Sequence, residues 1–372
     1  MIKGLVIALA CVFVSACAQN VPAIGTDSTL EVATWNVEWF GDLNYGPSND
    51  TKQFDNVVDV FKKSKIDVWG LQEIADKTAW DSLLSNLSNE YNGVLSTWSQ
   101  TQKTGLIYNK NKFTFIYQKH ILALYQYEFA SGRLPLEVAL EYKHDNRIDT
   151  CYFFVLHMKA NTGSNSDKAL ALNRRKTAAD GLRNYLNDNC KGKFFFVIGD
   201  WNDDLDKSIY NNQTSPFRQF ANDTSNFFFA SEILTDAGEQ STVYYSNMID
   251  HICVSKNTKN GFISDTDIDV FRLDNYISSY GSSTSDHYPV YCKFYPSKWH
   301  SKNSSSLQLI SNSPDIFWDG RNLVVPFKHK ELKYFNMQGQ TLKSDGLPSN
   351  QLIVYQLNSG NKRYTGKFVI NQ

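Results

Sequence analysis

The apolar positions of this chain change between two periods, and the change predicts strands and helices in alternation. Apolar residues spaced three and four positions apart indicate amphipathic helices near residues 54–61 and 80–87, and again from Asp167 to about residue 186. Short runs rich in β-branched and aromatic residues predict strands at 30–35, 66–73, 104–109, 113–118, 135–142, 151–158, 193–200, 249–255 and 288–295.

Most of these strand-like runs are apolar at consecutive positions rather than at every second one. A strand of this kind is buried on both faces, so its sheet has to be covered by helices or by a second sheet. The sequence therefore predicts a layered α/β domain at residues 28–296. Polar clusters fall at the ends of the strands, which is where α/β sheets place their sites.

The pattern changes after Tyr295. Residues 297–312 are rich in Ser, Asn and Lys and predict a linker. Residues 313–372 alternate apolar and polar positions between turn residues, which predicts a small all-β sandwich module. This last part of the sequence has no cluster of acids and histidines, so we expect the chemistry to belong to residues 28–296.

Composition narrows the class of protein. Hydrophobic residues make up 42% of the chain and aromatic residues 14%, which is enough for a large core and too much for a disordered chain. The formal net charge is −1, so no overall positive field attracts a polyanion. Binding of nucleic acid would therefore depend on a local cationic patch or on a bound metal ion.

Residues 1–18 predict an export signal. Lys3 precedes an apolar run at 4–16 that is too short to span a bilayer, and small residues follow it. The motif A-C-A at 16–18 fits cleavage after residue 18, whereas V-S-A-C ending at Cys17 resembles a lipoprotein box with an acylated cysteine. In either case we expect a bacterial protein that is secreted or held at the outer cell surface, without stable membrane insertion after processing.

The mature chain keeps cysteines at positions 151, 190, 253 and 292. An even number in an exported protein is compatible with disulfides, although sequence does not choose the pairing. Cys151 opens one buried strand and Cys190 precedes another, so a bond between them is the first prediction. Buried free thiols are the alternative, because a domain of this size is stable without crosslinks.

Polar side chains gather at the ends of the predicted strands. The stretch FFVIGDWNDD, residues 195–204, leads an apolar run directly into acids that repel one another, which indicates a cation between them. The whole set of strand-end residues is Asn36, Glu38, Glu73, Arg133, His157, Asp200, Asn202, Asp250, Asp286 and His287. Its oxygen-rich ligands, without Cys–His pairs at zinc spacing, favour Mg²⁺, with Mn²⁺ or Ca²⁺ as alternatives.

The order of these motifs resembles the endonuclease/exonuclease/phosphatase superfamily, which includes DNase I-like enzymes. N-x-E follows the first strand and Q-E the second, and R-x-P, a strand-end histidine, G-D-x-N, I-D-H-I and S-D-H-x-P-V come after them. Each motif alone occurs by chance, but the ordered set spans residues 30–295. The resemblance implies a four-layer αββα sandwich with its site at one edge of the packed sheets.

The resemblance also implies residue roles on the metal side of the site. Glu73 is the expected principal metal ligand, assisted by Glu38, Asn36 and Asp286, and Asn36 and Arg133 are expected to contact the substrate. Hydrolysis of a phosphodiester develops charge on the phosphate oxygens and on the leaving alkoxide. A divalent ion, imidazoles and an arginine supply the complementary charge without a covalent step.

On the phosphate side, the resemblance implies that Asp200 and Asn202 hold the scissile phosphate, a nucleophilic water or a second metal. Asp250 is expected to orient His287 and stabilise its charge, and His157 is the second imidazole over the phosphate. A histidine backed by a carboxylate donates or accepts a proton near neutral pH. Which imidazole activates water and which protonates the leaving group stays open at this stage.

Several neighbouring polar residues are interpreted as structural. Residues 203–204 are interpreted as no more than an Asx-rich turn, and His251 as an ordinary strand residue rather than a ligand. The basic run at 174–176 indicates either a patch that steers phosphate or a solvated helix face, and the solvated face is the simpler interpretation. The same choice applies to Lys103 and Lys159.

The function predicted from these features is that of an exported, metal-dependent nuclease acting on DNA, and on RNA as an alternative substrate. A phosphatase or a sphingomyelinase-like phosphodiesterase of the same fold is the second hypothesis. Inositol phosphatases of the family are expected to carry W-C-D-R where this chain has MIDHI, which favours the nuclease. A catalytically idle binding protein is the third hypothesis, and it is disfavoured because every catalytic position is filled.

The C-terminal module loosely resembles the sorting domains of the type IX secretion system of Bacteroidota. FNMQGQTLK and the final strand KFVIN carry the resemblance, whereas NQLIVYQL departs from the usual pattern because it lacks a glycine before its tyrosine. The resemblance implies the secretion machinery as a partner. A carbohydrate-binding or purely structural β-sandwich is the alternative.

Overall fold

The computed structural model describes residues 20–300 and, nearer the C-terminus, 317–318, 323–324, 331–336, 339–349, 351–359 and 362–369. Two compact units divide the chain between Trp299 and His300. Trp299 packs against Phe194 with ring centroids 4.7 Å apart, so the first unit extends past residue 296. The predicted signal peptide, Cys17 and most of the predicted linker lie outside the described residues.

The first unit contains two mixed six-stranded sheets. One sheet has the order β11-β12-β1-β2-β4-β3, in which β1 and β2 are parallel and the other neighbours antiparallel. Its strands are β1 (Leu30–Phe40), β2 (Val68–Ile74), β3 (Tyr91–Leu95), β4 (Lys103–Asn109), β11 (Ile268–Val270) and β12 (Val290–Phe294). Strand β1 lies in its centre.

The other sheet has the order β5-β6-β7-β8-β10-β9, and only β7 and β8 are parallel. Its strands are β5 (Phe113–His120), β6 (Leu136–His144), β7 (Arg147–His157), β8 (Phe194–Asp200), β9 (Phe227–Phe229) and β10 (Asp250–Ser255). The sheets pack face to face through β1, β2 and β4 on one side and β7, β8 and β10 on the other.

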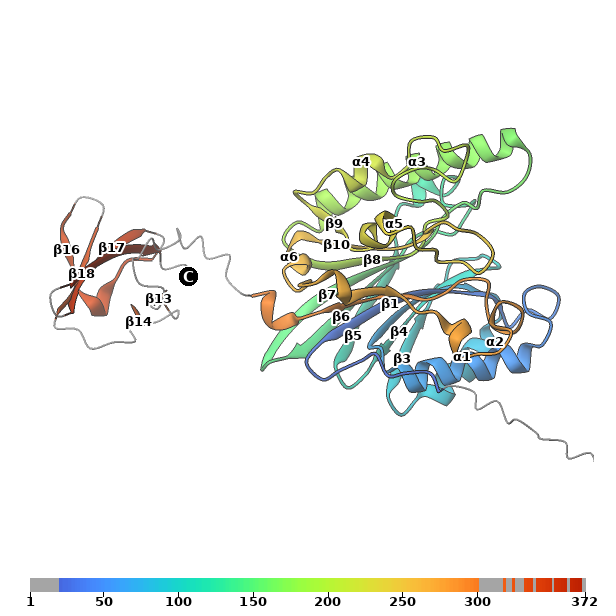
Figure 1. Cartoon of the computed structure of the whole chain (residues 1–372), viewed down its shortest axis with the longest axis horizontal. Coiled ribbons are helices and arrows are strands. Elements are labelled where there is room, and N and C mark those ends of the chain that lie inside the picture. The colour runs from blue at the N-terminus through green and yellow to red at the C-terminus, as the bar shows by residue number, and fades with distance from the viewer. Residues whose placement is uncertain are drawn as a thin grey trace, which may run out of the picture. The chain divides into compact units, whose positions relative to one another are not determined.

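Helices cover both outer faces of this pair of sheets. Figure 1 shows α1 (Asp50–Ser64) and α2 (Lys77–Leu87) against the sheet of β1, and α3 (Asn165–Asn189) and α4 (Arg218–Ala221) against the sheet of β8. The unit is therefore the four-layer αββα sandwich expected from the resemblance. Shorter helices are α5 (Glu232–Asp236), α6 (Lys256–Lys259) and α7 (Tyr280–Ser283), with 3₁₀ turns at Ala123–Tyr125, Asp265–Asp267, Leu273–Asn275 and Pro296–Lys298. A further 3₁₀ turn, Ser344–Gly346, belongs to the second unit.

Local sequence signals explain where the long helices begin. The side chains of Asn49 and Asp76 cap α1 and α2 by accepting from backbone N–H groups inside each helix. At α3, Ser164 and Asp167 form a reciprocal capping box. No helix among the described residues has the length and apolar character needed to cross a membrane.

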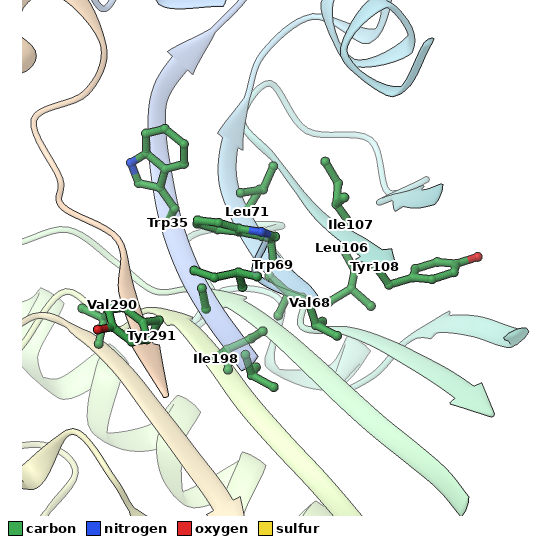
Figure 2. Packing of buried hydrophobic residues seen from close by; sticks show 14 of the residues in the cluster. Trp35, Val68, Trp69, Leu71, Leu106, Ile107, Tyr108, Ile198, Val290 and Tyr291 are labelled. Carbon is green, nitrogen blue, oxygen red and sulfur yellow. The ribbon is translucent and has the colours of Figure 1, made fainter. Parts of the chain in front are cut away.

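The core is densely aromatic on the side of α1, and between the sheets aliphatic side chains pack together with Phe153 and Phe196, whose ring centroids lie 4.9 Å apart. Figure 2 shows Trp35 and Trp69 from neighbouring strands, and their ring centroids lie 6.0 Å apart. Between the sheets, a Cβ atom on Gly70 would lie 2.6 Å from Cδ1 of Ile198. Glycine at this position therefore allows the two sheets to approach closely.

All strands and helices predicted from the sequence of this unit are present, although the short strands β3, β9 and β11 were not expected. The predicted Cys151–Cys190 disulfide is wrong, because the cysteines at 151, 190, 253 and 292 are buried free thiols. Cys151 belongs to the core between the sheets, whereas Cys190 belongs to the core beneath α3. Side chains on opposite faces of one sheet do not reach each other.

The second unit is an all-β module. Its strands are β13 (Phe317–Trp318), β14 (Leu323–Val324), β15 (Glu331–Phe335), β16 (Thr341–Leu342), β17 (Leu352–Ser359) and β18 (Lys362–Val369). A four-stranded antiparallel sheet has the order β16-β15-β17-β18, and β13 pairs with β14. Ile353, Tyr355 and Leu357 are buried at every second position of β17, which confirms the alternation expected of this module.

Candidate active site

Three adjacent strands of the β8 sheet end in polar residues at the same edge. Alternate residues of β7, β8 and β10 face the core between the sheets, among them Val155, Ile198 and Ile252. The next position in that alternation is His157 on β7, Asp200 on β8 and Asp250 on β10. The strand register places Asp200 opposite both His157 and Asp250. One face of one sheet thus aligns an imidazole and two carboxylates.

The facing sheet contributes Asn36 from β1. Its side-chain amide donates to Oδ2 of Asp200 across the gap between the sheets, with a nitrogen–oxygen distance of 3.2 Å. The backbone N–H of Asn202 donates to the other oxygen of Asp200 at 2.8 Å, and Asn202 has a φ of +56°. A Cβ at Gly199 would lie 2.3 Å from the carbonyl oxygen of Leu156, so the motif G-D-x-N needs its glycine here.

Irregular backbone positions the two glutamates. Glu38, Trp39 and Glu73 have φ values of +45°, +50° and +63°, and the pairing of β1 with β2 shifts register between Asn36 and Phe40. The N–H of Trp39 donates to Oε2 of Glu73 at 3.2 Å. Positive φ at residues other than glycine costs about 1–3 kcal/mol each, and such strain gathers at functional sites.

Gln53 of α1 holds the irregular part of β1 in place. Its side-chain amide nitrogen donates to the carbonyl oxygens of Val37, Glu38 and Thr284 at 2.8, 2.8 and 3.0 Å. Gln53 was not predictable from the sequence, because a single glutamine on an amphipathic helix carries no signal of its own. Its contacts join β1 to the segment that carries Asp286 and His287.

Residues 285–287 precede β12 and complete the site. Oγ of Ser285 donates to the carbonyl oxygen of Asn36 at 2.6 Å, and the N–H of Asp286 donates to Oε2 of Glu38 at 2.9 Å. Nδ1 of His287 lies 2.8 Å from Oδ2 of Asp250. The buried Asp250 carboxylate therefore fixes the orientation of the imidazole through one ring nitrogen and leaves Nε2 for other partners.

Arg133 reaches the site from the loop before β6. A guanidinium nitrogen lies 2.9 Å from Nε2 of His157, and another donates to the carbonyl oxygen of Met158 at 2.9 Å. His157 Nε2 is 3.5 Å from Oδ2 of Asp200 and 3.7 Å from Oε1 of Glu73. All the site residues expected from the sequence thus join one connected network, although their roles stay predictions.

Burial and mutual repulsion raise the pKa values of the carboxyl groups. Burial, followed by repulsion from Asp286, raises the pKa of Glu38 to about 7. Burial raises the pKa of Asp200 to about 7 as well, partly opposed by the charge of His287, and it raises the pKa of Glu73. These acids resist ionisation in each other's company unless a cation joins them.

The pKa values of the two imidazoles are shifted in opposite directions. Burial, followed by the charge of Arg133, holds the pKa of His157 well below its ordinary value. Burial alone would also lower the pKa of His287, but the carboxylates of Asp250 and Asp286 raise it well above its ordinary value. The surroundings therefore favour the protonated form of His287 and the neutral form of His157.

The kinds of donor in the site suit a hard divalent ion, although among the described residues no three of its carboxylate and imidazole ligand atoms lie within 4.8 Å of one another. The carboxylates lie close together, because the charge of Asp286 raises the pKa values of Glu38 and Glu73, and the charge of Glu73 also raises the pKa of Glu38. Within the described residues, no lysine or arginine forms an ion pair with Glu38 or Asp286. Oxygen ligands of this kind suit Mg²⁺, Mn²⁺ or Ca²⁺ rather than zinc.

The interpretations of Arg175 and Asp203 from the sequence are wrong. Arg175 does not lie on a solvated face or a phosphate-steering patch, and Asp203 is not a simple turn residue. Both are fully buried, and Nη2 of Arg175 lies 2.8 Å from Oδ2 of Asp203. His251 does fill a strand position, between Oγ of Ser231 and the carbonyl oxygen of Asp203, facing away from the site.

Known proteins similar to this chain share the fold described above. The model of the endonuclease/exonuclease/phosphatase family matches residues 33–287. Among solved structures, D. rerio TDP2 humanized by 14 mutations has 15% sequence identity and a TM-score of 0.51, over 72% of this chain and 99% of that chain. No curated protein matches the sequence.

Two further solved structures are similar at the same level. Truncated Caenorhabditis elegans TDP2 has 16% identity and a TM-score of 0.50, with 72% of this chain and 98% of that chain covered. An endonuclease/exonuclease/phosphatase from Bacteroides vulgatus has 16% identity and a TM-score of 0.50, with 71% and 98% covered. At these identities the likeness shows the shared fold.

Proposed function

Because the chain belongs to the endonuclease/exonuclease/phosphatase family, we propose that it is an exported, divalent-metal-dependent nuclease that cleaves DNA, with RNA as a second substrate. The family makes the protein a phosphodiester hydrolase, and the proposal adds its substrate, its metal and its location. The observation that carries it is the network in which Asp200 contacts Asn36, His157 and Asn202 at one edge of the sheets.

The geometry suggests how the residues share the reaction. In this proposal Asp200, which accepts from two N–H donors, orients the attacking water and takes its proton. His157 and Arg133 lie side by side and supply hydrogen bonds to phosphate oxygens. His287, fixed by Asp250, carries a proton toward the charge that develops on the phosphate and the leaving oxygen.

The metal belongs on the glutamate side of the site. Glu73, Glu38 and Asp286 would hold Mg²⁺, which supplies positive charge against the phosphate oxygens when bound. Asn36 fixes Asp200, and its own carbonyl oxygen accepts from Ser285. These contacts keep the glutamate side and the histidine side of the site in register.

Nucleic acid is favoured over inositol phosphates by the sequence around Asp250. That residue stands in MIDHI, where inositol phosphatases of the family are expected to carry W-C-D-R. Export is supported by the signal-like residues 1–18. Delivery by a secretion system through the C-terminal module remains a prediction from the sequence of that module.

A substrate panel tests the proposal. Purified mature protein is incubated with plasmid DNA, RNA, sphingomyelin or inositol phosphates, each with Mg²⁺, Ca²⁺ or EDTA. We expect nucleic acid to be cleaved with Mg²⁺ and not with EDTA. Glu73→Ala and His287→Ala are expected to lose about 10²–10⁴-fold in rate. Glu90→Ala, which removes an exposed carboxylate paired with Lys65, serves as the matched control and should keep full activity.

The outcomes separate the parts of the proposal. Hydrolysis of a lipid or of a small phosphate ester, with DNA and RNA intact, would show that the substrate is wrong and the enzyme class right. Parent-like rates for both Glu73→Ala and His287→Ala on every substrate would show that the site itself is assigned to the wrong residues.

A further inference from the structure

Arg133 belongs to the candidate active site and also to the wall of a neighbouring cavity of about 330 Å³. Residues 99–102, between β3 and β4, form one side of this cavity. The turn at 130–132 and Lys159, which lies just beyond β7, form other parts, and α3 contributes Arg174. The cavity therefore lies next to the position at which a phosphate would contact His157.

The charges around the cavity have one sign. Arg133, Lys159 and Arg174 line it, and no aspartate or glutamate is among its lining residues. Burial lowers the pKa of Lys159, and the charges of Arg133 and Arg174 lower it further. Cations held together without a carboxylate repel one another, and a bound anion removes that repulsion.

Four side-chain polar atoms of the residues that line the cavity have no hydrogen-bond partner. Among the described residues, Nε of Arg133, Nε of Arg174 and both side-chain amide atoms of Gln100 are buried without a hydrogen bond. A buried polar atom without a partner costs about 1–3 kcal/mol. The turn beside them is also strained, because Ala130 and Ser131 have φ values of +50° and +64°. The residues that carry these unpaired atoms line the cavity together with Lys159, so the case for a bound anion rests on the three cations gathered there.

We propose that this cavity binds a second phosphate of the substrate, the one next to the scissile phosphate on a polynucleotide strand. The inference rests on the proposed nuclease function and makes it more specific. Arg133 connects the two phosphate positions, while Lys159 and Arg174 contact only the second. The protein then prefers a strand with consecutive phosphates over a diester with a single phosphate.

Paired substrates test the subsite. The kcat/KM is measured on a single-stranded oligonucleotide and on bis(p-nitrophenyl) phosphate, which has one phosphate. For Arg174→Gln and Lys159→Gln, we expect kcat/KM on the oligonucleotide to fall roughly tenfold more than on the small diester. Lys176→Gln removes an exposed cation from the same helix outside the cavity, and it should leave both values at the parental level.

Two variants are needed because Arg174 also has a structural contact. Its guanidinium donates to the carbonyl oxygen of Tyr127 and to Oγ of Ser131, so the substitution loosens the turn. The only hydrogen bond from the Lys159 ammonium within the described residues is to the carbonyl oxygen of Ala160, so Lys159→Gln changes charge with little loss of structure. Unchanged melting temperatures confirm that each variant is folded.

Binding without catalysis separates the subsite from the nuclease activity. The affinity for a fluorescent oligonucleotide is measured in EDTA at several salt concentrations. Each cavity variant is expected to reduce the slope of log affinity against log salt by roughly 0.7, the value for one phosphate contact on a single strand. A slope equal to that of the parent overturns the subsite.

The remaining outcomes each decide one question. An equal loss of kcat/KM on both substrates overturns the subsite, because Lys159 and Arg174 then act on the scissile phosphate or on folding. A selective loss on inositol polyphosphates instead of the oligonucleotide also overturns it. If the parent binds the oligonucleotide through Lys159 and Arg174 but cleaves neither substrate, the subsite stands and the nuclease proposal fails.

Discussion

At Glu73 a strained backbone, a fixed carboxylate and an unfavourable charge occur in one residue. Its φ is +63°, and the N–H of Trp39 orients its side chain. Burial raises the pKa of its carboxyl group. A protein selected only for stability would not keep a buried, strained acid here. The arrangement is understandable if the carboxylate is stabilised by a bound cation.

Removing the Glu73 carboxylate should weaken the stabilisation of the folded protein by Mg²⁺. For the parent, Mg²⁺ at about a hundred times its dissociation constant is expected to stabilise the folded state by about 2.7 kcal/mol. This corresponds to a rise of several degrees in melting temperature. In Glu73→Gln we expect less than half of that rise, because the main ligand is lost. Melting is followed by calorimetry with Mg²⁺ and with EDTA.

The matched control for this measurement is Glu90→Gln, which alters an exposed carboxylate of an ion pair with Lys65. It should keep the full response to Mg²⁺. An equal stabilisation of the parent and Glu73→Gln by Mg²⁺ would mean that the ion binds elsewhere or that Glu73 is not a ligand.

Whether a single site residue could be predicted from the sequence depends on how far it differs from its neighbours along the chain. His157, Asp200 and Asp250 were predictable, because each interrupts an apolar strand at its end. Gln53 and Arg175 were not, because each is one polar residue among many on its helix, and most of the others are exposed or half-buried. Whether such a residue is buried is decided by its partner, and the partner is distant in sequence.

Among the elements, α3 shows how one buried ion pair positions a loop. Arg175 donates through Nε and Nη2 to Oδ2 of Asp203 and through Nη1 to the carbonyl oxygen of Lys159. Asp203 in turn accepts from Oγ of Ser208 and from the N–H of Ile209. The helix is thereby fixed to the loop after β8 and to the segment after β7, both of which carry site residues.

Breaking this pair should destabilise the protein strongly. Arg175→Met leaves the buried carboxylate of Asp203 without its cation, and we expect a loss of about 3–5 kcal/mol in the free energy of unfolding. Lys176→Met changes the exposed neighbour on the same helix and should stay within about 0.5 kcal/mol of the parent. Urea denaturation measures both. A loss below 1 kcal/mol for Arg175→Met would show that the pair contributes little beyond its burial cost.

Element prediction from the sequence worked where strands were long and apolar and failed where they were short. Strands β9 and β11 contain three residues each and pair only with the ends of their neighbours, so no periodicity marks them. The prediction of a Cys151–Cys190 disulfide failed for a different reason. Sequence alone does not reveal that Cys190, at the end of α3, packs into the core beneath that helix while Cys151 faces the other sheet.

For the molecule as a whole, carboxyl groups that are buried or half-buried occur at both ends of β1. Glu38 lies at the active-site end, and Glu31 lies at the opposite end beside Asp67 and Lys112. Burial raises the pKa of Glu31 to about 7, with the Thr29 hydroxyl opposing the shift and the charge of Asp67 adding to it. The Glu31 end is remote from the proposed metal ligands, so its effect on stability can be measured without metal.

Glu31 should make the stability of the protein fall as the pH rises. The folded state binds the proton of Glu31 more tightly than the unfolded state does, since the folded pKa of about 7 exceeds the ordinary value of 4.5. Its favourable contribution is therefore complete below pH 4.5 and is lost as the pH rises through 7. Glu31→Gln removes this loss. As the pH rises from 4.5 to 7, the free energy of unfolding of the variant should therefore increase relative to that of the parent by about 1–3 kcal/mol.

Denaturation of the parent and Glu31→Gln in EDTA from pH 4 to pH 9 measures this difference, with Glu90→Gln as an exposed control expected to change stability by less than about 0.5 kcal/mol. A difference between Glu31→Gln and the parent that stays constant with pH would contradict the raised pKa of Glu31. Repeating the series with Mg²⁺ should improve stability above pH 7 in both proteins alike, because the ion acts on the acids at the other end of β1. The two ends of one strand would then titrate independently, one neutralised by protons and the other by metal.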